Sequence, residues 1–143
     1  MRLPPHLHLT VLPGEFAVCH LPAGSPLPAH EPGTSFWSVT VTPEEVSVAC
    51  LAEAVPAGAD VHRGLRAIKI EGPLEFDVVG VLGSLIAPLA QAGISVFAAS
   101  TYNTDYVLVS EHTLRQAVTA LKVAGHLFEP PSTADPSVTK DAR

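Results

Sequence analysis

The chain has 143 residues, the usual size of one domain or of two small units that share a core. Hydrophobic residues make up 47% and charged residues 15%, which allows a large core and argues against global disorder. Eight basic residues against fourteen acidic ones give a net charge of −6 without any basic stripe, which argues against a nucleic-acid partner.

The first part of the chain, residues 1–58, is predicted to consist of strands and turns. Residues 6–12 alternate between apolar and polar side chains, and the turn signal Pro13–Gly14 predicts a hairpin with the next strand. A loop with four prolines follows over residues 22–35, because proline is kept out of central strands. Residues 42–45 carry a helix-start pattern, for one turn at most. The strands are expected over residues 6–12, 15–21, 36–41 and 46–54.

The second part of the chain is predicted to alternate strands with two helices, after a linker over residues 60–65. Asp77 is expected to cap the first helix and Gly93 to end it, and Pro88 should kink it. Residues 129–143 hold three prolines and few apolar side chains, so we expect a disordered tail. The strands are expected over residues 65–71, 94–99, 106–110 and 126–128, and the helices over residues 78–92 and 111–124.

A polar connection, residues 101–105, joins two apolar strands in the middle of this βαββαβ order, which closes as one antiparallel sheet with both helices on one face. A short polar loop on a rigid base is a common way to build a small-ligand site. Asp105 could hold an ammonium or guanidinium group, and Asn103 and Thr104 could bind other polar groups of a ligand. The alternative is an ordinary hairpin turn, in which these residue types are common for backbone reasons.

The start of the first helix is the second candidate site. Its unpaired backbone N–H groups and partial positive charge suit a ligand carboxylate, and Gly80 would let a ligand approach closely. The alternative is that Asp77 only caps the helix, which would also neutralise part of the charge at this end.

Three separated segments in the second part of the chain, taken in order, resemble an ACT domain. They are Glu71–Leu74, Phe76–Leu82 and Gly93–Val109. More closely, the chain resembles the small stand-alone bacterial ACT proteins, which are related to the ACT domains of aspartate kinases and of the cytosolic arginine sensors. The resemblance implies an α+β fold with two tandem ferredoxin-like βαββαβ units and antiparallel sheets. Residues 65–128 would be the ACT domain, and residues 1–58 a degenerate ACT-like unit.

The resemblance also implies a function, because ACT domains bind small ligands, usually amino acids, at domain or subunit interfaces. By this likeness the loop from Pro73 to Gly80 lies beside the ligand, and Asp105 matches an acidic residue at the pocket of the arginine sensors. It also implies a homodimer, since ACT sheets commonly pair side by side. The expected ligand-binding residues are Asp77, Val79, Gly80, Val81, Thr101, Asn103, Thr104 and Asp105. The alternative is an ACT-like structural or protein-interaction module that binds no metabolite.

Other kinds of site find little support in the sequence. His6 and His8 share a strand face without a third ligand at a telling spacing, so no metal or cofactor is expected. Cys19 and His20 are strand neighbours that point to opposite faces, so we expect no catalytic pair and no enzyme. Cys19 and Cys50 are expected to be buried. Without a membrane-length apolar run or a signal-peptide core, the expected location is cytoplasmic, with no membrane partner.

Overall fold

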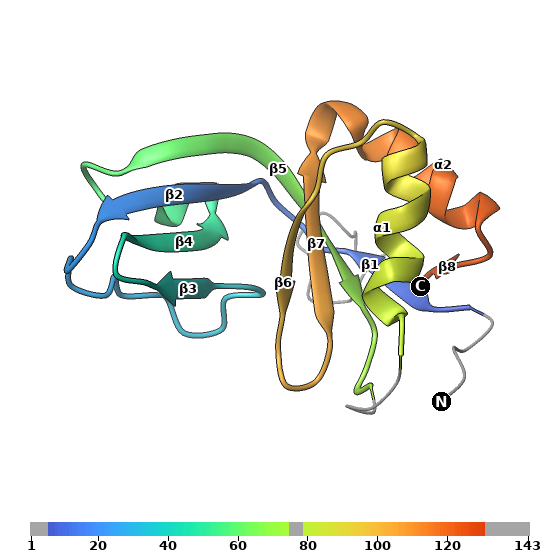
Figure 1. Ribbon diagram of the computed structural model, residues 1–143, viewed down its shortest axis with the longest axis horizontal. Coiled ribbons are helices and arrows are strands. Elements are labelled where there is room, and N and C mark those ends of the chain that lie inside the picture. The colour runs from blue at the N-terminus through green and yellow to red at the C-terminus, as the bar shows by residue number, and fades with distance from the viewer. Residues whose placement is uncertain (1–5, 75–78, 131–143) are drawn as a thin grey trace, which may run out of the picture. The chain divides into compact units, whose positions relative to one another are not determined.

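The computed structural model describes residues 6–74 and 79–130 (Figure 1). The chain divides into two compact units: Gly14–Leu65, which we call the strand unit, and Met1–Pro13 together with Arg66–Arg143, which we call the helical unit. No helix among the described residues is long and apolar enough to cross a bilayer. The elements are β1 (His8–Val11), β2 (Phe16–Pro22), β3 (Ser38–Val41), β4 (Glu45–Leu51), the 3₁₀ turn η1 (Ala52–Ala54), β5 (Asp60–Ile70), α1 (Val81–Gln91), β6 (Phe97–Ser100), β7 (Asp105–Ser110), the 3₁₀ turn η2 (Glu111–Thr113), α2 (Leu114–Val123) and β8 (Leu127–Phe128).

The helical unit has the predicted βαββαβ order, from β5 through α1, β6, β7 and α2 to β8. Strand β7 pairs with β5 and, antiparallel, with β6. Alternate residues of the strands pack against the helices, so α1 and α2 cover one face of the sheet. The opposite face carries no helix among the described residues, and we call it the open face. The α+β, ferredoxin-like fold is thereby confirmed. The buried core consists of Leu7, Leu9, Ile68, Ile70, Val81, Leu85, Leu89, Ile94, Val107, Val109, Ala117 and Leu121.

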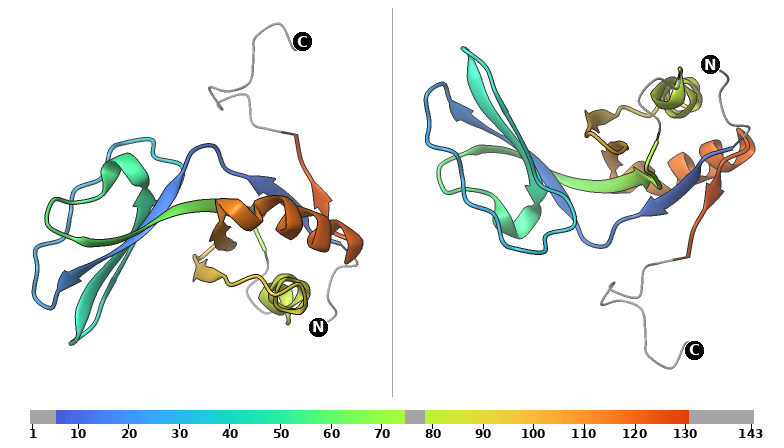
Figure 2. Two further views of the ribbon diagram at one scale, coloured as in Figure 1. Left: turned by 90° about the horizontal axis from the view of Figure 1, so that it is seen from above. Right: turned by 90° about the horizontal axis from the view of Figure 1, so that it is seen from below.

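Strand β1 lies within this sheet, between β5 and β8. It pairs antiparallel with β5, where Leu9 is opposite Ile70, and parallel with β8, where Leu9 is opposite Phe128. Both views of Figure 2 show β1 and β8 side by side. The predicted hairpin of residues 6–12 with residues 15–21 is therefore wrong, and the sheet is mixed rather than purely antiparallel. The reason is that the apolar face of β1 belongs to the helix-covered core.

The strand unit is built from β2, β3, β4 and the first part of β5, all paired antiparallel. Its core contains Cys19, Val46, Val48 and Cys50, which are almost fully buried. Within the described part of this unit, η1 is the only helical turn and no α-helix forms. That this unit is a degenerate ACT-like unit stays a prediction.

Residues 60–65 are the first half of a strand, which corrects the expected linker. Backbone pairing places Val61 opposite Cys19, and the side chain of Val61 packs against the core of the strand unit. The helix-start pattern at residues 42–45 is also not realised as a helix. The hydroxyl of Thr42 accepts hydrogen bonds from the backbone N–H groups of Glu44 and Glu45, both at 3.2 Å, and this turn joins β3 to β4.

The first helix is shorter than predicted. Gly80, with φ of 81°, is the N-cap residue of α1, and the predicted cap, Asp77, lies outside the described residues. The predicted end at Gly93 is confirmed, since Gly93 has a φ of 77° and the N–H of Ile94 donates to the carbonyl of Leu89 at 2.9 Å. The expected disordered tail falls almost entirely on residues 131–143, outside the described residues.

Candidate functional site

The polar connection between β6 and β7 is closed by hydrogen bonds between its two threonines. The backbone N–H of Thr101 donates to the carbonyl oxygen of Thr104 at 2.8 Å. The Thr101 hydroxyl accepts from the N–H of Thr104 at 3.2 Å and lies 3.1 Å from its carbonyl oxygen. Between them Tyr102 is 90% exposed. The tip is therefore a fixed turn that projects side chains outward.

Two further hydrogen bonds tie this turn to the end of β5. The buried hydroxyl of Thr104 donates to the carbonyl oxygen of Ile70 at 2.6 Å. The N–H of Leu74 donates to the carbonyl oxygen of Asn103 at 2.8 Å. Gly72 lies so close that a Cβ atom there would be 3.0 Å from the Asn103 oxygen. The turn and the loop after β5 thus form one packed structure, joined largely through backbone atoms.

A pocket of about 200 Å³ lies where these two segments meet, and we call it the hairpin pocket. It holds three of the predicted residues, and Lys69 adds a positive charge to its wall. Amide, hydroxyl and ammonium groups can together bind the polar end of a small molecule. The lining residues are Lys69, Gly72, Pro73, Thr101, Asn103, Thr104 and Tyr106.

The other predicted residues lie near this pocket in sequence but do not line it. Val79 is exposed, and the side chain of Val81 is buried in the core, so Val81 could offer only its backbone N–H. Gly80 opens α1, and its backbone is the part that a ligand could reach. Asp105 is half-buried at the start of β7, opposite Ser100. Asp77 lies outside the described residues.

Sequence reasoning missed three lining residues, Lys69, Gly72 and Tyr106, of which Lys69 is the most informative. In β5 the residues Ile68 and Ile70 face the helices, so Lys69 and Glu71 lie on the open face of the sheet. Two charges alternating with buried isoleucines, directly before Gly72, are a visible signal in the sequence. That signal is weak by itself, because such an alternation is usually only a solvated strand face.

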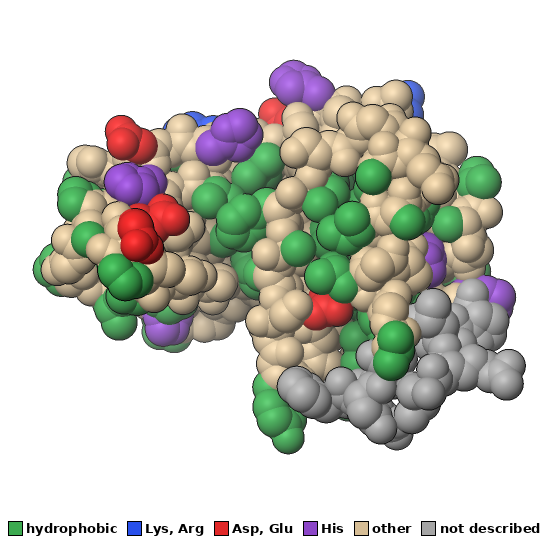
Figure 3. All heavy atoms as spheres, in the orientation of Figure 1, with side chains coloured by type: hydrophobic (Ala, Val, Ile, Leu, Met, Phe, Trp, Pro, Cys, Tyr) green, Lys and Arg blue, Asp and Glu red, His purple; other side chains and the backbone are tan. Residues whose placement is uncertain are grey.

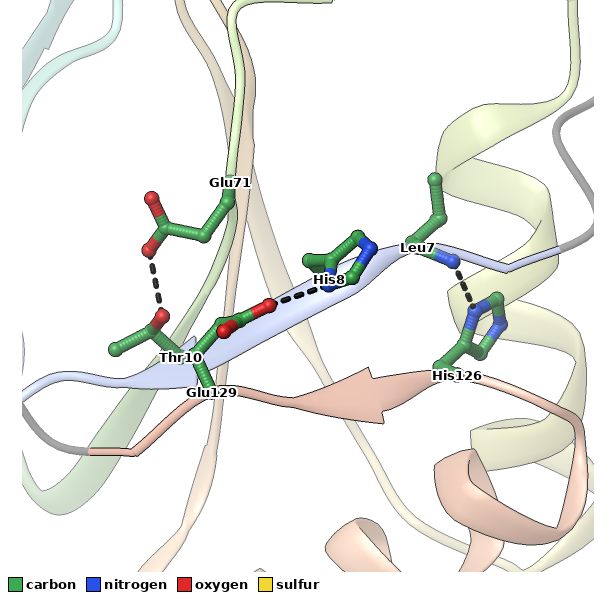
Figure 4. A network of polar contacts seen from close by, with 6 residues as sticks. All are labelled: Leu7, His8, Thr10, Glu71, His126 and Glu129. Atoms are coloured by element: carbon green, nitrogen blue, oxygen red, sulfur yellow. Dashed lines mark hydrogen bonds and ion pairs between the residues drawn. The ribbon is translucent and has the colours of Figure 1, made fainter.

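A second depression, of about 510 Å³, adjoins the hairpin pocket at Gly72. Figure 4 shows its polar contacts: the Thr10 hydroxyl donates to Glu71 at 2.5 Å, and His8 pairs with Glu129. The lining residues are His8, Thr10, Glu71, Gly72, Glu129 and Pro130, and we call it the His8–Glu129 depression. Lys69 Nζ is 3.7 Å from Glu71 Oε1, so an ion pair links the walls of the two hollows.

The geometry does not favour a metal site or a nucleophilic cysteine. Among the described residues, no three His, Cys, Asp or Glu side chains gather as metal ligands would. Cys19 and Cys50 are buried free thiols, and burial, followed by the neighbouring Cys19, raises the pKa of Cys50 to about 11. Burial also raises the pKa of Cys19. Both thiols are therefore neutral at pH 7 and poor nucleophiles.

Two family models match the chain, one in each part. A model described as "ACT domain" matches residues 60–123, from β5 through α2. A second, described as an N-terminal domain, matches residues 14–58, inside the strand unit. The boundary between the two matches thus lies close to the boundary between the strand unit and the helical unit.

Similar proteins are known among curated sequences and solved structures. The cytosolic arginine sensor for mTORC1 subunit 1 of Homo sapiens is 38% identical over 58 residues, which are 40% of this chain and only 18% of the sensor. A crystal structure from Agrobacterium tumefaciens is 32% identical, with a TM-score of 0.82 over 94% of this chain and all of that one. The regulatory subunit of aspartate kinase from Thermus thermophilus shares the fold, with 13% identity and a TM-score of 0.55 over 80% of this chain and 94% of that one.

Proposed function

The chain belongs to the ACT domain family, and from this premise we propose that it is a regulatory protein that binds an amino acid and catalyses no reaction. The curated relative is named for sensing arginine, and a structural neighbour is named as a regulatory subunit. Because the match covers about a fifth of the sensor, the whole sensor's activity is not carried over. A cytoplasmic location is part of the proposal, by the same likeness.

The hairpin pocket is the observation that supports this proposal. It combines three residues expected at a ligand site with a lysine that suits a carboxylate. The two hydrogen bonds from Thr104 and Leu74 hold its walls in place before any ligand arrives. A pocket formed in advance binds more tightly, because less conformational freedom is lost on binding.

A regulatory signal requires that the ligand favour one of two arrangements of the protein. We propose that a bound amino acid favours one such arrangement, with backbone N–H groups of residues 79–81 and the carboxylate of Asp105 completing the contacts. We also propose that the protein acts as a homodimer, in which a second copy closes the open side of the site.

A thermal-shift screen with the twenty common amino acids, each tested singly at millimolar concentration, is the direct test. A ligand at about 100 times its dissociation constant should stabilise the protein by about 2.7 kcal/mol. Replacing Asp105 with Asn should weaken binding of a basic amino acid more than binding of a neutral one. Asp60→Asn, which changes an almost fully exposed carboxylate in the strand unit, is the matched control. If no amino acid raises the melting temperature, the sensor function is rejected.

The alternative function is a protein-interaction module without a metabolite ligand. It is favoured by α1, which carries no charged residue between Val81 and Gln91. On the face shown in Figure 3, hydrophobic side chains spread over α1 and β6, with few charged groups among them. Light scattering separates the two functions: a dimer whose association does not respond to any amino acid favours the interaction module.

A further inference from the structure

Lys69 and Glu71 form an ion pair on the open face of the sheet, opposite α1 and α2. The nitrogen–oxygen distance is 3.7 Å, and the two side chains are 32% and 37% exposed. Ion pairs this accessible to water contribute little to the stability of the fold. Separating the two charges therefore costs little, provided that each charge gains a new partner.

The pair lies between the two depressions of the helical unit. Lys69 lines the hairpin pocket, Glu71 lines the His8–Glu129 depression, and Gly72 lines both. A small molecule placed over Gly72 therefore meets a positive charge on one side and a negative charge on the other.

The carboxylate of Glu71 is already oriented for such a contact. One of its oxygens accepts the hydrogen bond from Thr10 at 2.5 Å, and Thr10 is only 8% exposed (Figure 4). Thr10 is also directly opposite Lys69 in the pairing of β1 with β5. The backbone bond from the N–H of Glu71 to the carbonyl of His8, at 2.8 Å, extends this pairing. The backbone that carries this carboxylate is thus held by pairing between β1 and β5, and such paired backbone is more rigid than a loop.

We propose that Lys69 and Glu71 bind the main-chain end of an α-amino acid, Lys69 holding its carboxylate and Glu71 its ammonium group. This assignment rests on the proposed function and adds a location and a ligand class to it. The ammonium and carboxylate groups of the ligand are both attached to its α-carbon, so a single molecule replaces both partners of the ion pair. Its side chain extends into the His8–Glu129 depression, whose volume of about 510 Å³ is typical of small-molecule sites.

The test uses calorimetric titration of the amino acid that gives the largest thermal shift, on the full chain. Lys69→Met and Glu71→Gln should each weaken binding at least tenfold. Lys122→Met, on the exposed surface of α2, is the matched control and should leave binding unchanged. Melting temperatures of the variants without ligand verify that each one folds.

Two analogues of the same amino acid test the assignment of each charge. The N-acetylated form lacks the ammonium group, so it should bind the wild type weakly and lose nothing more on Glu71→Gln. The amidated form lacks the carboxylate and should likewise be insensitive to Lys69→Met. If each variant weakens both analogues further, the assignment of charges is wrong.

The remaining outcomes distinguish failure of the open-face site from failure of the proposed amino-acid-binding function. If Asp105→Asn abolishes binding but Lys69→Met and Glu71→Gln bind as the wild type does, the open-face site is rejected and the amino-acid function stands. If Lys69→Met and Glu71→Gln weaken binding and Asp105→Asn does not, the open-face site is supported and Asp105 has no role. If none of the twenty amino acids binds, both proposals are rejected.

Discussion

At the scale of single residues, removing the buried hydroxyl of Thr104 should lower the free energy of unfolding. It donates to the carbonyl oxygen of Ile70 at 2.6 Å, and Thr104 is only 6% exposed. Thr104→Val keeps the shape but leaves this carbonyl without its hydrogen bond. A buried group without a partner costs about 1–3 kcal/mol. Urea unfolding should show a loss of this size.

Thr113→Val is the control for this effect. Its hydroxyl makes a similar bond, to the carbonyl oxygen of Ser110 at 3.0 Å, but the site is only partly buried. Water can replace the lost bond there, so the cost should be clearly smaller. Equal losses for the two variants would mean that the Thr104 bond does not secure the turn between β6 and β7.

The thiol of Cys50 predicts a loss of stability at high pH. Burial raises its pKa from 9.0 to about 11, because the thiolate is poorly solvated in the core of the strand unit. A raised pKa contributes stability that is fully present below pH 9 and is lost as the pH rises through about 11. Each pKa unit corresponds to 1.36 kcal/mol, so the loss is at most about 3 kcal/mol.

Urea unfolding of the wild type and of Cys50→Ala, measured between pH 8 and pH 11, tests this dependence. The alanine variant is less stable at pH 8 because it leaves a cavity, but the difference should narrow as the pH rises. Groups that titrate in this range and do not contact Cys50 affect both proteins in a similar way, whereas Cys19, whose thiol hydrogen-bonds to Cys50, contributes to the difference between the two curves. Parallel curves over the whole range would show that the pKa of Cys50 is the same in the folded and unfolded states, so that burial does not raise it.

At the scale of elements, Gly72 and Gly83 differ in the space around them, so the same substitution should have opposite effects at the two positions. A Cβ atom at Gly72 would lie 3.0 Å from the carbonyl oxygen of Asn103 and 3.1 Å from the N–H of Leu74. Both are backbone atoms that bond to each other, so they cannot move aside cheaply. Gly72→Ala should therefore destabilise the protein by about 1–3 kcal/mol and open the hairpin pocket.

Gly83 provides the comparison, because it lies inside α1 and a Cβ atom there would meet no neighbouring group within 4 Å. Alanine is favoured over glycine in a helix by about 1 kcal/mol, so Gly83→Ala should raise the stability of the isolated chain. Thermal melting of both variants measures the contrast. A stabilising Gly72→Ala would show that the turn and the loop after β5 are not packed as described.

Much of the βαββαβ order could be predicted from local signals. Gly93 ends α1 as expected, and the apolar runs on either side of residues 101–105 form β6 and β7. The start of α1 could not be predicted, because Asp77 is a good cap by composition but the helix begins after Gly80. Lys69 was missed as a lining residue for a related reason: most of its neighbours in the pocket come from a hairpin more than thirty positions away.

At the scale of the whole molecule, the order of the strands in the sheet differs from their order along the chain. Local turn chemistry at Pro13–Gly14 predicts a hairpin, but β1 pairs with β5 and β8 instead. The pairing of Leu9 with Ile70 spans the entire strand unit, and no local signal encodes a contact of that length. The alternation of residues 6–12 thus predicts the apolar face of β1 correctly but not its partner.

The unit to which β1 belongs can be tested with a single core substitution. Leu9 is fully buried and shares a core with Leu85 and Leu89 of α1. Leu9→Ala should destabilise the protein by about 2–5 kcal/mol, as removal of a buried leucine side chain usually does. Hydrogen exchange should then become faster in α1, β5 and β7, because local stability is shared within a cooperative unit.

Val48→Ala is the reciprocal variant, because Val48 is fully buried in the core of the strand unit. It should accelerate exchange in β2, β3 and β4 more than in α1. If Leu9→Ala instead accelerates exchange mainly in β2 and β4, then β1 is energetically part of the strand unit, as the first half of the sequence predicts. A uniform response to both variants would mean that the two units unfold as one, and that a ligand in the hairpin pocket would stabilise the strand unit as well.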